Sequence, residues 1–256
     1  MNTLLAITRM TLITIAALIA LVLVFFASLL PVRVRRASLS LWVVVYAARV
    51  FMFLFNVRVI CTEPELLRQH EGLIFMNHMS YLEALGILSL TPVRFMAAVE
   101  VRRRAISGWI AARMGTIFVE RDNASSRSIT RDSVRTVMQL SPYPPMVVFP
   151  EGRLGDGVRL HQFRFGIFDI ACEGSIPYLL CAVQFNRPDV AVWRGPRGES
   201  LMSAIWKLAK SRGKIFVDIF PLYVVHPTPQ DNPRQLARNA RRDVAEHLGI
   251  AAGIPE

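Results

Sequence analysis

The fold of this chain is decided by residues 73–90, which read LIFMNHMSYLEALGILSL. The first four residues are apolar and precede an Asn-His pair, a pattern that predicts a short buried strand over 73–76. From residue 82 onward the apolar side chains recur at helical spacing, which predicts a helix over about 82–90. His78 therefore lies at the turn between a strand and a helix.

The same turn is followed by a carboxylate, Glu83, five residues after His78. On one ideal helix the two side chains would be about 140° apart, so they meet only if His78 folds back from the turn. That geometry suits a histidine base whose second ring nitrogen is oriented by a carboxylate. Ser80 is the expected N-cap of the helix, with Glu83 in the capping-box position. In the alternative interpretation Glu83 serves only that cap, and His78 is an ordinary loop histidine.

The front of the chain predicts a membrane anchor. Residues 11–30 are apolar apart from small hydroxyl side chains, and about 20 such residues can cross a bilayer. A cleaved signal peptide has a shorter apolar core and a small-x-small cleavage site, which does not stand out before Pro31, so a retained anchor is favoured. Arg33, Arg35 and Arg36 follow, and the positive-inside rule puts the rest of the chain in the cytosol. The expected location is the cytoplasmic membrane, which is called the inner membrane in a cell that also has an outer membrane.

A second apolar run covers residues 41–55 and contains Arg49. It is short for a span and is charged, so we expect a re-entrant or interfacial helix on the same leaflet. The alternative is a second span in which Arg49 snorkels to the interface. The chain is thus expected to have an anchor over residues 1–56 and one domain over 57–256.

The charge balance narrows the possible partners. Lys and Arg number 30 against 19 Asp and Glu, for a net charge of +11, which suits nucleic acid, or an anionic membrane and phosphorylated substrates. The apolar front favours the membrane, and no RNA-binding signature is present, so nucleic acid is not expected as a partner. The 3 cysteines lie far apart in apolar settings, which favours neither a zinc site nor a disulfide framework.

Beyond residue 56 short apolar strands alternate with helices, which predicts an α/β fold with a mainly parallel sheet flanked by helices. Polar clusters at His78, Arg121 and Glu151 each follow an apolar strand, and ligands of such sheets bind outside the carboxyl ends of the strands. Residues 62–69 are expected to form a charged turn. Strands are expected over 57–61, 73–76, 93–96, 116–119, 146–149, 176–183 and 214–221, and helices over 82–90, 106–114, 125–140, 165–172, 200–211 and 234–248.

These clusters resemble the motifs of the glycerolipid acyltransferase family, whose best-known member is 1-acylglycerol-3-phosphate acyltransferase. The resemblance covers roughly residues 55–225, with the motifs in the family's order. The family's Asn-His-x-Ser-x-x-Asp is matched at 77–83, its Phe-x-x-Arg at 118–121 and its Phe-Pro-Glu-Gly in full at 149–152. Residues 163–166 and 176–177 are similar to two further segments of the family.

The resemblance implies a role for each site residue. His78 would act as a general base, taking a proton from a lysolipid hydroxyl as that hydroxyl attacks an acyl thioester. Glu83 would orient the ring and stabilise the imidazolium. Arg121 would bind the phosphate or other anionic headgroup of the acceptor. The other residues expected in the substrate site are Asn77, Ser80, Phe118, Glu151, Gly152 and Arg153.

The implied reaction needs no catalytic Ser or Cys, because the substrate hydroxyl is itself the nucleophile, and neither a cofactor nor a metal is expected. The donor would be acyl-CoA or acyl carrier protein. The acceptor would be a lysophospholipid, first of all 1-acylglycerol-3-phosphate, which would give phosphatidic acid. Membrane lipids are the other expected partner, with the catalytic domain on the cytosolic face.

Several positions depart from the family pattern. Glu83 replaces the motif's Asp, Ala98 stands where many members have lysine, and Arg153-Leu154 replaces Thr-Arg. The following Gly155-Asp156-Gly157 resembles members that acylate other lysolipids, including the ornithine-lipid branch. Two other functions therefore stay open: acylation of another lysolipid such as lyso-ornithine lipid, and an inactive membrane-anchored relative that only binds lipid.

Two of the expected site residues also have a plainer interpretation. Arg121 could be a surface ion-pair partner of Asp122 or Glu120. Glu151 could be a neighbour of a helix N-cap, where a carboxylate is favourable. The acyltransferase interpretation further requires an apolar groove beside His78 to hold an acyl chain.

Overall fold

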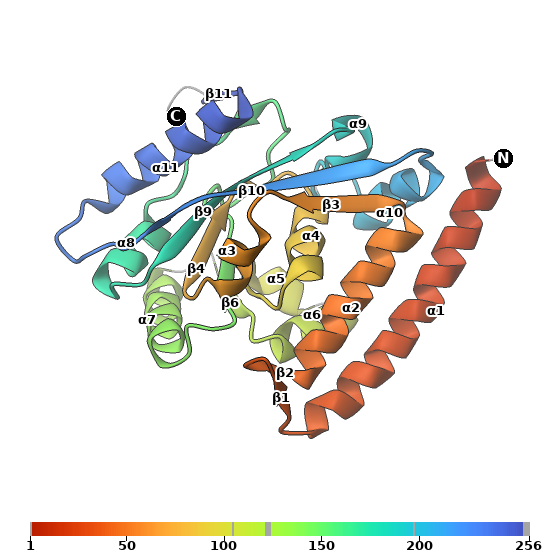
Figure 1. Cartoon of the computed structure of the whole chain (residues 1–256), viewed down its shortest axis with the longest axis horizontal. Coiled ribbons are helices and arrows are strands. Elements are labelled where there is room, and N and C mark those ends of the chain that lie inside the picture. Colours follow the sequence, from red (N-terminus) through yellow and green to blue (C-terminus); the bar gives the residue numbers. More distant parts are fainter. Residues whose placement is uncertain (1, 104, 121–123, 197, 253–256) are drawn as a thin grey trace.

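The computed structural model describes residues 2–103, 105–120, 124–196 and 198–252. Within these residues a central sheet of seven strands has the spatial order β3-β10-β9-β4-β7-β5-β6 (Figure 1). Neighbouring strands are parallel except β9 and β10, which are antiparallel, so the predicted mainly parallel α/β fold is confirmed. In spatial order the strands are β3 (Val57–Cys61), β10 (Ile215–Val225), β9 (Tyr178–Phe185), β4 (Leu73–Met76), β7 (Met146–Val148), β5 (Arg94–Ala98) and β6 (Ile117–Val119).

Helices cover both faces of the sheet. Strand β4 is buried on both sides, with Ile74 and Met76 in one core cluster and Leu73 and Phe75 in the other, as the two-residue period of a strand requires. Helices α2, α4 and α10 contribute to the first cluster, and α7, α8 and α11 contribute to the second. The helices of this domain are α3 (Pro64–Gln69), α4 (Leu82–Leu90), α5 (Val99–Arg102), α6 (Ala105–Arg113), α7 (Ala124–Leu140), α8 (Gly166–Glu173), α9 (Pro188–Ala191), α10 (Leu201–Lys210) and α11 (Pro233–Leu248).

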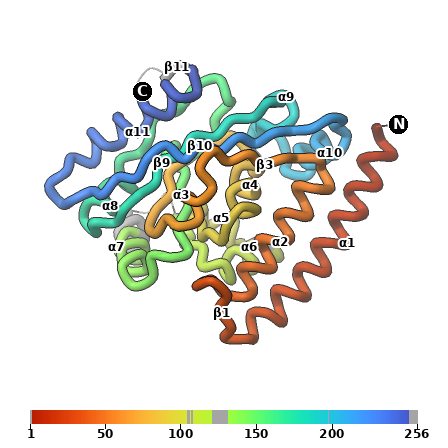
Figure 2. The backbone as a smooth tube through the Cα atoms, in the orientation of Figure 1, coloured from red at the N-terminus to blue at the C-terminus, as the bar shows by residue number. Residues whose placement is uncertain are grey.

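Two helices precede the sheet. Helix α1 (Asn2–Leu29) is joined to α2 (Leu39–Leu54) by a small hairpin of β1 (Arg33–Val34) and β2 (Ala37–Ser38). The two helices run side by side in opposite directions, at the end of the molecule remote from α11 (Figure 2). In the described residues, α1 is the one helix that is long and apolar enough to cross a membrane. It starts well before residue 11, and most of its surface is exposed.

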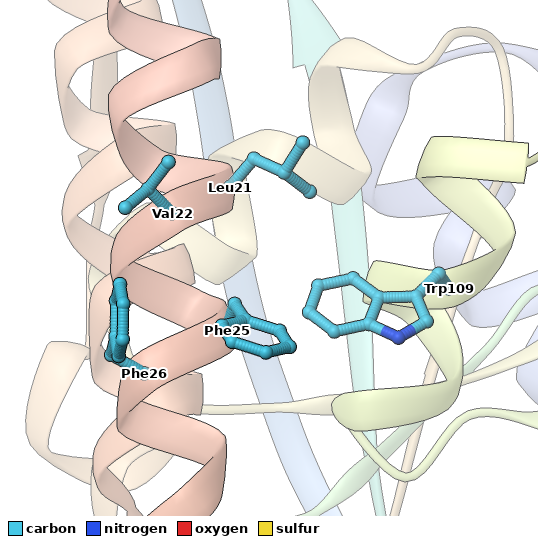
Figure 3. Close-up of a pocket in the computed structure, with 5 residues that line it drawn as sticks. All are labelled: Leu21, Val22, Phe25, Phe26 and Trp109. Carbon is cyan, nitrogen blue, oxygen red and sulfur yellow. The ribbon is translucent and has the colours of Figure 1, made fainter.

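Helix α1 also contacts the sheet domain. The Arg9 guanidinium donates hydrogen bonds to the carbonyls of Ala209 and Ser211, at 3.1 and 2.7 Å, beside the C-terminal end of α10. Further along α1, an apolar notch of about 370 Å³ separates it from α6. Figure 3 shows Leu21 and Phe25 of α1 pointing across this notch toward Trp109 of α6. The first helix is therefore packed along the domain rather than held on a free linker.

The structure adds elements that the sequence pattern did not predict. The expected charged turn contains helix α3, whose first residue, Pro64, suits that position because the proline has no N–H to leave unpaired. Strand β10 continues past Pro221 to Val225, through an irregular register beside β9. Beyond Ile219 it has lost its pairing with β3 and is an edge strand, where proline is tolerated. A short pair of β8 (Arg159–Leu160) and β11 (Ala251–Ala252) lies outside the main sheet.

Candidate active site

The residue pair expected at the turn after β4 does meet. Oxygen Oε1 of Glu83 lies 2.6 Å from Nδ1 of His78. The same oxygen accepts hydrogen bonds from the amides of Met79, at 2.9 Å, and Ser80, at 2.8 Å. Glu83 is fully buried, whereas the His78 side chain is 23% exposed. The carboxylate thus gathers the turn around itself and leaves one side of the imidazole open.

The expected N-cap is wrong. The helix begins at Leu82, Tyr81 occupies the cap position, and no side chain caps it. The hydroxyl of Ser80 is buried and has no hydrogen-bond partner within the described part of the chain. The reciprocal half of a capping box is present, since Glu83 accepts the Ser80 amide. This carboxylate satisfies the free amides of the turn, so the serine hydroxyl is not needed for them.

The contact with Glu83 decides which nitrogen of His78 can act as a base. A carboxylate accepts, so Nδ1 carries the ring proton and Nε2 keeps its lone pair. Within the described residues Nε2 makes no hydrogen bond. The ring also stacks on Phe149, with centroids 4.0 Å apart and planes at 17°. The imidazole is therefore held by one nitrogen and one face, with the other nitrogen available to a substrate.

The segment after β7 holds the backbone of His78. Oxygen Oε1 of Glu151 accepts the His78 amide at 2.8 Å, and its Oε2 accepts the His161 amide at 2.9 Å. The Gly155 amide donates to the His78 carbonyl at 2.7 Å. Burial raises the pKa of Glu151 to about 7, against the opposing effect of the two amides. Glu151 was expected to shape the acceptor site, but its carboxylate faces backbone amides and is 3% exposed.

Gly152 and Arg153 lie on the outer side of that segment. Gly152 has φ +65°, and a Cβ there would lie 2.8 Å from Nε of Arg164, so the position needs glycine. The Arg153 guanidinium is exposed and lies 3.1 Å from Nδ1 of His161. Of the residues expected from the third motif, Arg153 is thus the one whose charge faces solvent.

Asn77 holds the end of β4 against β9. Its Oδ1 accepts the Val183 amide at 2.8 Å, and its Nδ2 donates to the Val183 carbonyl at 2.9 Å. Asn77 and Ser80 are both fully buried. Both were expected to contact substrate, but the structure buries both beneath the turn, where Asn77 ties β4 to β9.

Phe118, the first residue of the second motif, lies apart from this turn. Phe118 is half-buried in β6, at one end of the sheet, and the Arg102 guanidinium lies 5.7 Å from its ring centroid. Three strand spacings separate β6 from β4, which is about 14 Å. Arg121 and Asp122 lie outside the described residues, so the expected phosphate contact stays a prediction. No group of three or more His, Cys, Asp or Glu side chains in the described ranges is arranged to hold a metal ion.

A groove on the other side of the turn was not expected. It has a volume of about 1090 Å³ and is lined by side chains from segments 154–161, 188–194 and 198–207. The Trp193 amide donates to the Met79 carbonyl at 3.0 Å, which ties the groove to the turn. No family motif lies within 186–207, so only the position of β9 beside β4 could have indicated it. We call this feature the polar groove.

Comparison with known proteins agrees with the geometry. Residues 58–184 match the model of the Acyltransferase family. A lyso-ornithine lipid O-acyltransferase of Pseudomonas aeruginosa is 28% identical over 182 residues, which cover 69% of this chain and 67% of that protein. Lysophosphatidylcholine acyltransferase 1 of Rattus norvegicus is 24% identical over 177 residues, 68% of this chain but only 32% of the rat protein.

A solved structure has the same fold. The crystal structure of the 1-acyl-sn-glycerophosphate (LPA) acyltransferase of Thermotoga maritima matches 97% of this chain and 95% of its own. The TM-score is 0.72 at 18% sequence identity, so this match concerns the fold alone. The family model and the curated relatives agree, and residues 58–184 of this chain form a domain of the Acyltransferase family, to which the glycerolipid acyltransferases belong.

Proposed function

We propose that this protein transfers a fatty acyl chain from an acyl thioester to the free hydroxyl of a lysolipid. The observation that carries the proposal is the contact of 2.6 Å between Nδ1 of His78 and Glu83, with Nε2 of the same ring left open. An inactive lipid-binding relative has no need of a buried carboxylate that fixes this tautomer. The intact pair therefore favours an enzyme over a binding protein.

The residues support a direct transfer. Nε2 of His78 takes the proton from the lysolipid hydroxyl, and the oxygen attacks the thioester carbonyl. The tetrahedral intermediate then collapses, the carbon–sulfur bond breaks, and the leaving thiolate takes the proton from Nε2. The Glu83 carboxylate stabilises the imidazolium that forms between these steps. Base catalysis of this kind contributes about 10²–10⁴ in rate.

The proposal extends to the acyl donor and to the location of the protein. A thioester donor implies acyl-CoA or acyl carrier protein, with no further cofactor. The exposed apolar surface of α1 would lie in the membrane, with the sheet domain at its cytosolic face as the positive-inside rule predicts. A lysolipid would then reach His78 from the lipid surface without crossing water.

Two acceptors are candidates. The family resemblance implies 1-acylglycerol-3-phosphate, which would give phosphatidic acid. Two observations favour lyso-ornithine lipid: the names of relatives from Pseudomonas aeruginosa and Rhizobium meliloti, and the departures at Arg153–Gly157. The Rhizobium protein is 29% identical over 175 residues, which cover 66% of this chain and 58% of that protein.

The test uses membranes that carry the full-length protein. They are incubated with each labelled donor thioester and a panel of lysolipids, and the diacyl product is measured. We expect product from the wild type and a loss of about 10³-fold for His78→Ala. His226→Ala, which changes a histidine remote from the turn, should keep the wild-type rate. Wild-type product no greater than that of His78→Ala, with every donor and acceptor, would reject the proposal.

A further inference from the structure

The polar groove is tied to the active-site turn through the backbone of His78 and Met79. One of its walls contains Gly155, whose amide donates to the His78 carbonyl at 2.7 Å. The opposite wall contains Trp193, whose amide donates to the Met79 carbonyl at 3.0 Å. Both walls are thus fixed by hydrogen bonds to two consecutive residues of the active-site turn, so the groove lies beside that turn.

The sheet order places the groove between the segments that follow the two neighbours of β4. Strand β9 is the parallel neighbour of β4 on one side, and β7, β5 and β6 follow on the other. The segment after β9 builds one wall of the groove, and the segment that follows β7 and the third motif builds the other. Phe118 belongs to β6, two strands beyond β7.

Most charges in the groove already have partners. Lys207 donates to Oε2 of Glu199 and to the Val192 carbonyl, both at 3.2 Å. Both carboxylate oxygens of Asp189 accept hydrogen bonds from Arg187, at 2.9 and 2.8 Å. These pairs balance each other, so they give the groove no net charge.

One acidic and one basic side chain of the groove, Asp156 and Arg194, have no ion-pair partner among the described residues. Oxygen Oδ1 of Asp156 accepts the amides of Val158 and Arg159, at 2.8 and 3.0 Å, and these bonds lower the pKa of the carboxyl, so it stays ionised. Its other oxygen has no partner among the described residues. Arg194 is exposed and makes no ion pair or hydrogen bond within the same ranges. The groove thus offers one open carboxylate and one open guanidinium.

We infer that the polar groove binds the headgroup of the acceptor lysolipid and that this headgroup is zwitterionic, with its cationic amine toward Asp156 and its anionic group toward Arg194. The inference rests on the proposed function and names the acceptor class for the same reaction. A headgroup that carries only a phosphate meets the Asp156 carboxylate with no cation to offset it. A zwitterion pairs with both open charges. Repulsion between the Asp156 carboxylate and a headgroup that carries only a phosphate lowers the affinity for that headgroup.

The test compares the wild type with two charge-removing variants of the full chain. Asp156→Asn keeps the oxygen that accepts the Val158 and Arg159 amides, and Arg194→Gln keeps a polar side chain of similar reach. The values of kcat and KM are measured with one donor for lyso-ornithine lipid, lysophosphatidylethanolamine and lysophosphatidic acid. Asp132→Asn, an exposed carboxylate on α7, is the matched control.

We expect the wild type to prefer the two zwitterionic acceptors. Asp156→Asn should raise KM for both by about fivefold, which corresponds to one exposed charge contact, with kcat and the KM for the donor unchanged. The same variant should lower KM for lysophosphatidic acid, because it removes a repulsion. Arg194→Gln should raise KM for all three, and Asp132→Asn should change none.

Other outcomes overturn the inference. A rise in KM for the donor alone would mean that the groove holds the donor. An equal change in KM for all three acceptors in Asp156→Asn would mean that this carboxylate does not distinguish acceptors by the charge of their headgroup. Failure of the proposed function can be told apart from failure of this inference, because in that case the wild type is no more active than His78→Ala. Binding of each lysolipid to His78→Ala, measured by calorimetry in micelles, must also show the zwitterion preference and its loss in the double variant with Asp156→Asn.

Discussion

The active-site turn and the polar groove lie side by side at one edge of the sheet, but their polar groups are used in opposite ways. In the turn, the amide, the carbonyl, one nitrogen and one face of His78 are each held by a neighbour. In the groove, Asp156 and Arg194 keep charge open toward solvent. A reaction step needs one fixed geometry, whereas choice of an acceptor needs charges that a ligand can still reach.

This difference sets the cost of changing each region. Removing one partner of a buried charged contact costs about 3–5 kcal/mol, because the other partner is left uncompensated. Substitutions at exposed positions usually stay within about 0.5 kcal/mol. We therefore expect changes in the turn to reduce both rate and stability, and changes in the groove to alter acceptor preference alone.

The strongest test of the comparison is Glu83→Gln. The amide has the shape of the carboxylate but not its charge, so its oxygen can still accept the ring N–H and the two turn amides, while the imidazolium loses the negative charge that stabilises it. We expect kcat to fall by about 10²–10³-fold with little change in KM. Glu100→Gln, on exposed α5, should keep the wild-type kcat. A Glu83→Gln enzyme with more than a tenth of the wild-type kcat would contradict the role given to this carboxylate.

The next test is Glu151→Gln. Glutamine has one acceptor oxygen, so either the His78 amide or the His161 amide loses its partner inside the protein. An unsatisfied buried amide costs about 1–3 kcal/mol, which should appear in the free energy of unfolding measured with urea near pH 5. We expect kcat to fall about tenfold through the displaced His78, while KM for the acceptor stays the same. A change in the KM for the acceptor alone would instead indicate that Glu151 contacts the acceptor, as the sequence analysis expected.

Glu151 also predicts a dependence of stability on pH. Its pKa in the folded protein is raised to about 7, mainly by burial, and lies above the ordinary value of 4.5. The folded state therefore binds more protons than the unfolded state between these values, so this group's contribution to stability falls as pH rises from about 5 to 7. The unfolding free energies of wild type and Glu151→Gln should differ most near pH 5 and converge toward pH 7.5. A constant difference would refute the shift.

The smallest effect is expected at Arg153, the exposed charge of the third motif. Its guanidinium lies beside His161, in the segment that holds the backbone of His78. For Arg153→Ala we expect an unfolding free energy within about 0.5 kcal/mol of the wild type. KM for anionic acceptors should rise about threefold with kcat unchanged. A fall in kcat would show that exposed charges at this edge also position the base, which would weaken the comparison.

The sequence by itself determined the strands of the main sheet and most helices, and it offered the meeting of His78 with Glu83 as one of two interpretations. These follow from local patterns: an apolar run makes a buried strand, helical spacing makes α4, and a short turn limits where two nearby side chains can point. Local pattern also misled once, because Ser80 has the chemistry of an N-cap but Glu83 takes the amides of the turn.

Only the tertiary structure decided what the other motif residues touch. Asn77 meets Val183, and Glu151 meets His78 and His161, because the sheet order sets β9 and β7 on either side of β4. The polar groove joins Asp156 to Arg194 across 38 positions of sequence, with no shared motif. Spacing along the chain reports neighbours within one turn or strand, but contacts between distant segments depend on which strands pair, and that is settled by burial of the whole sheet.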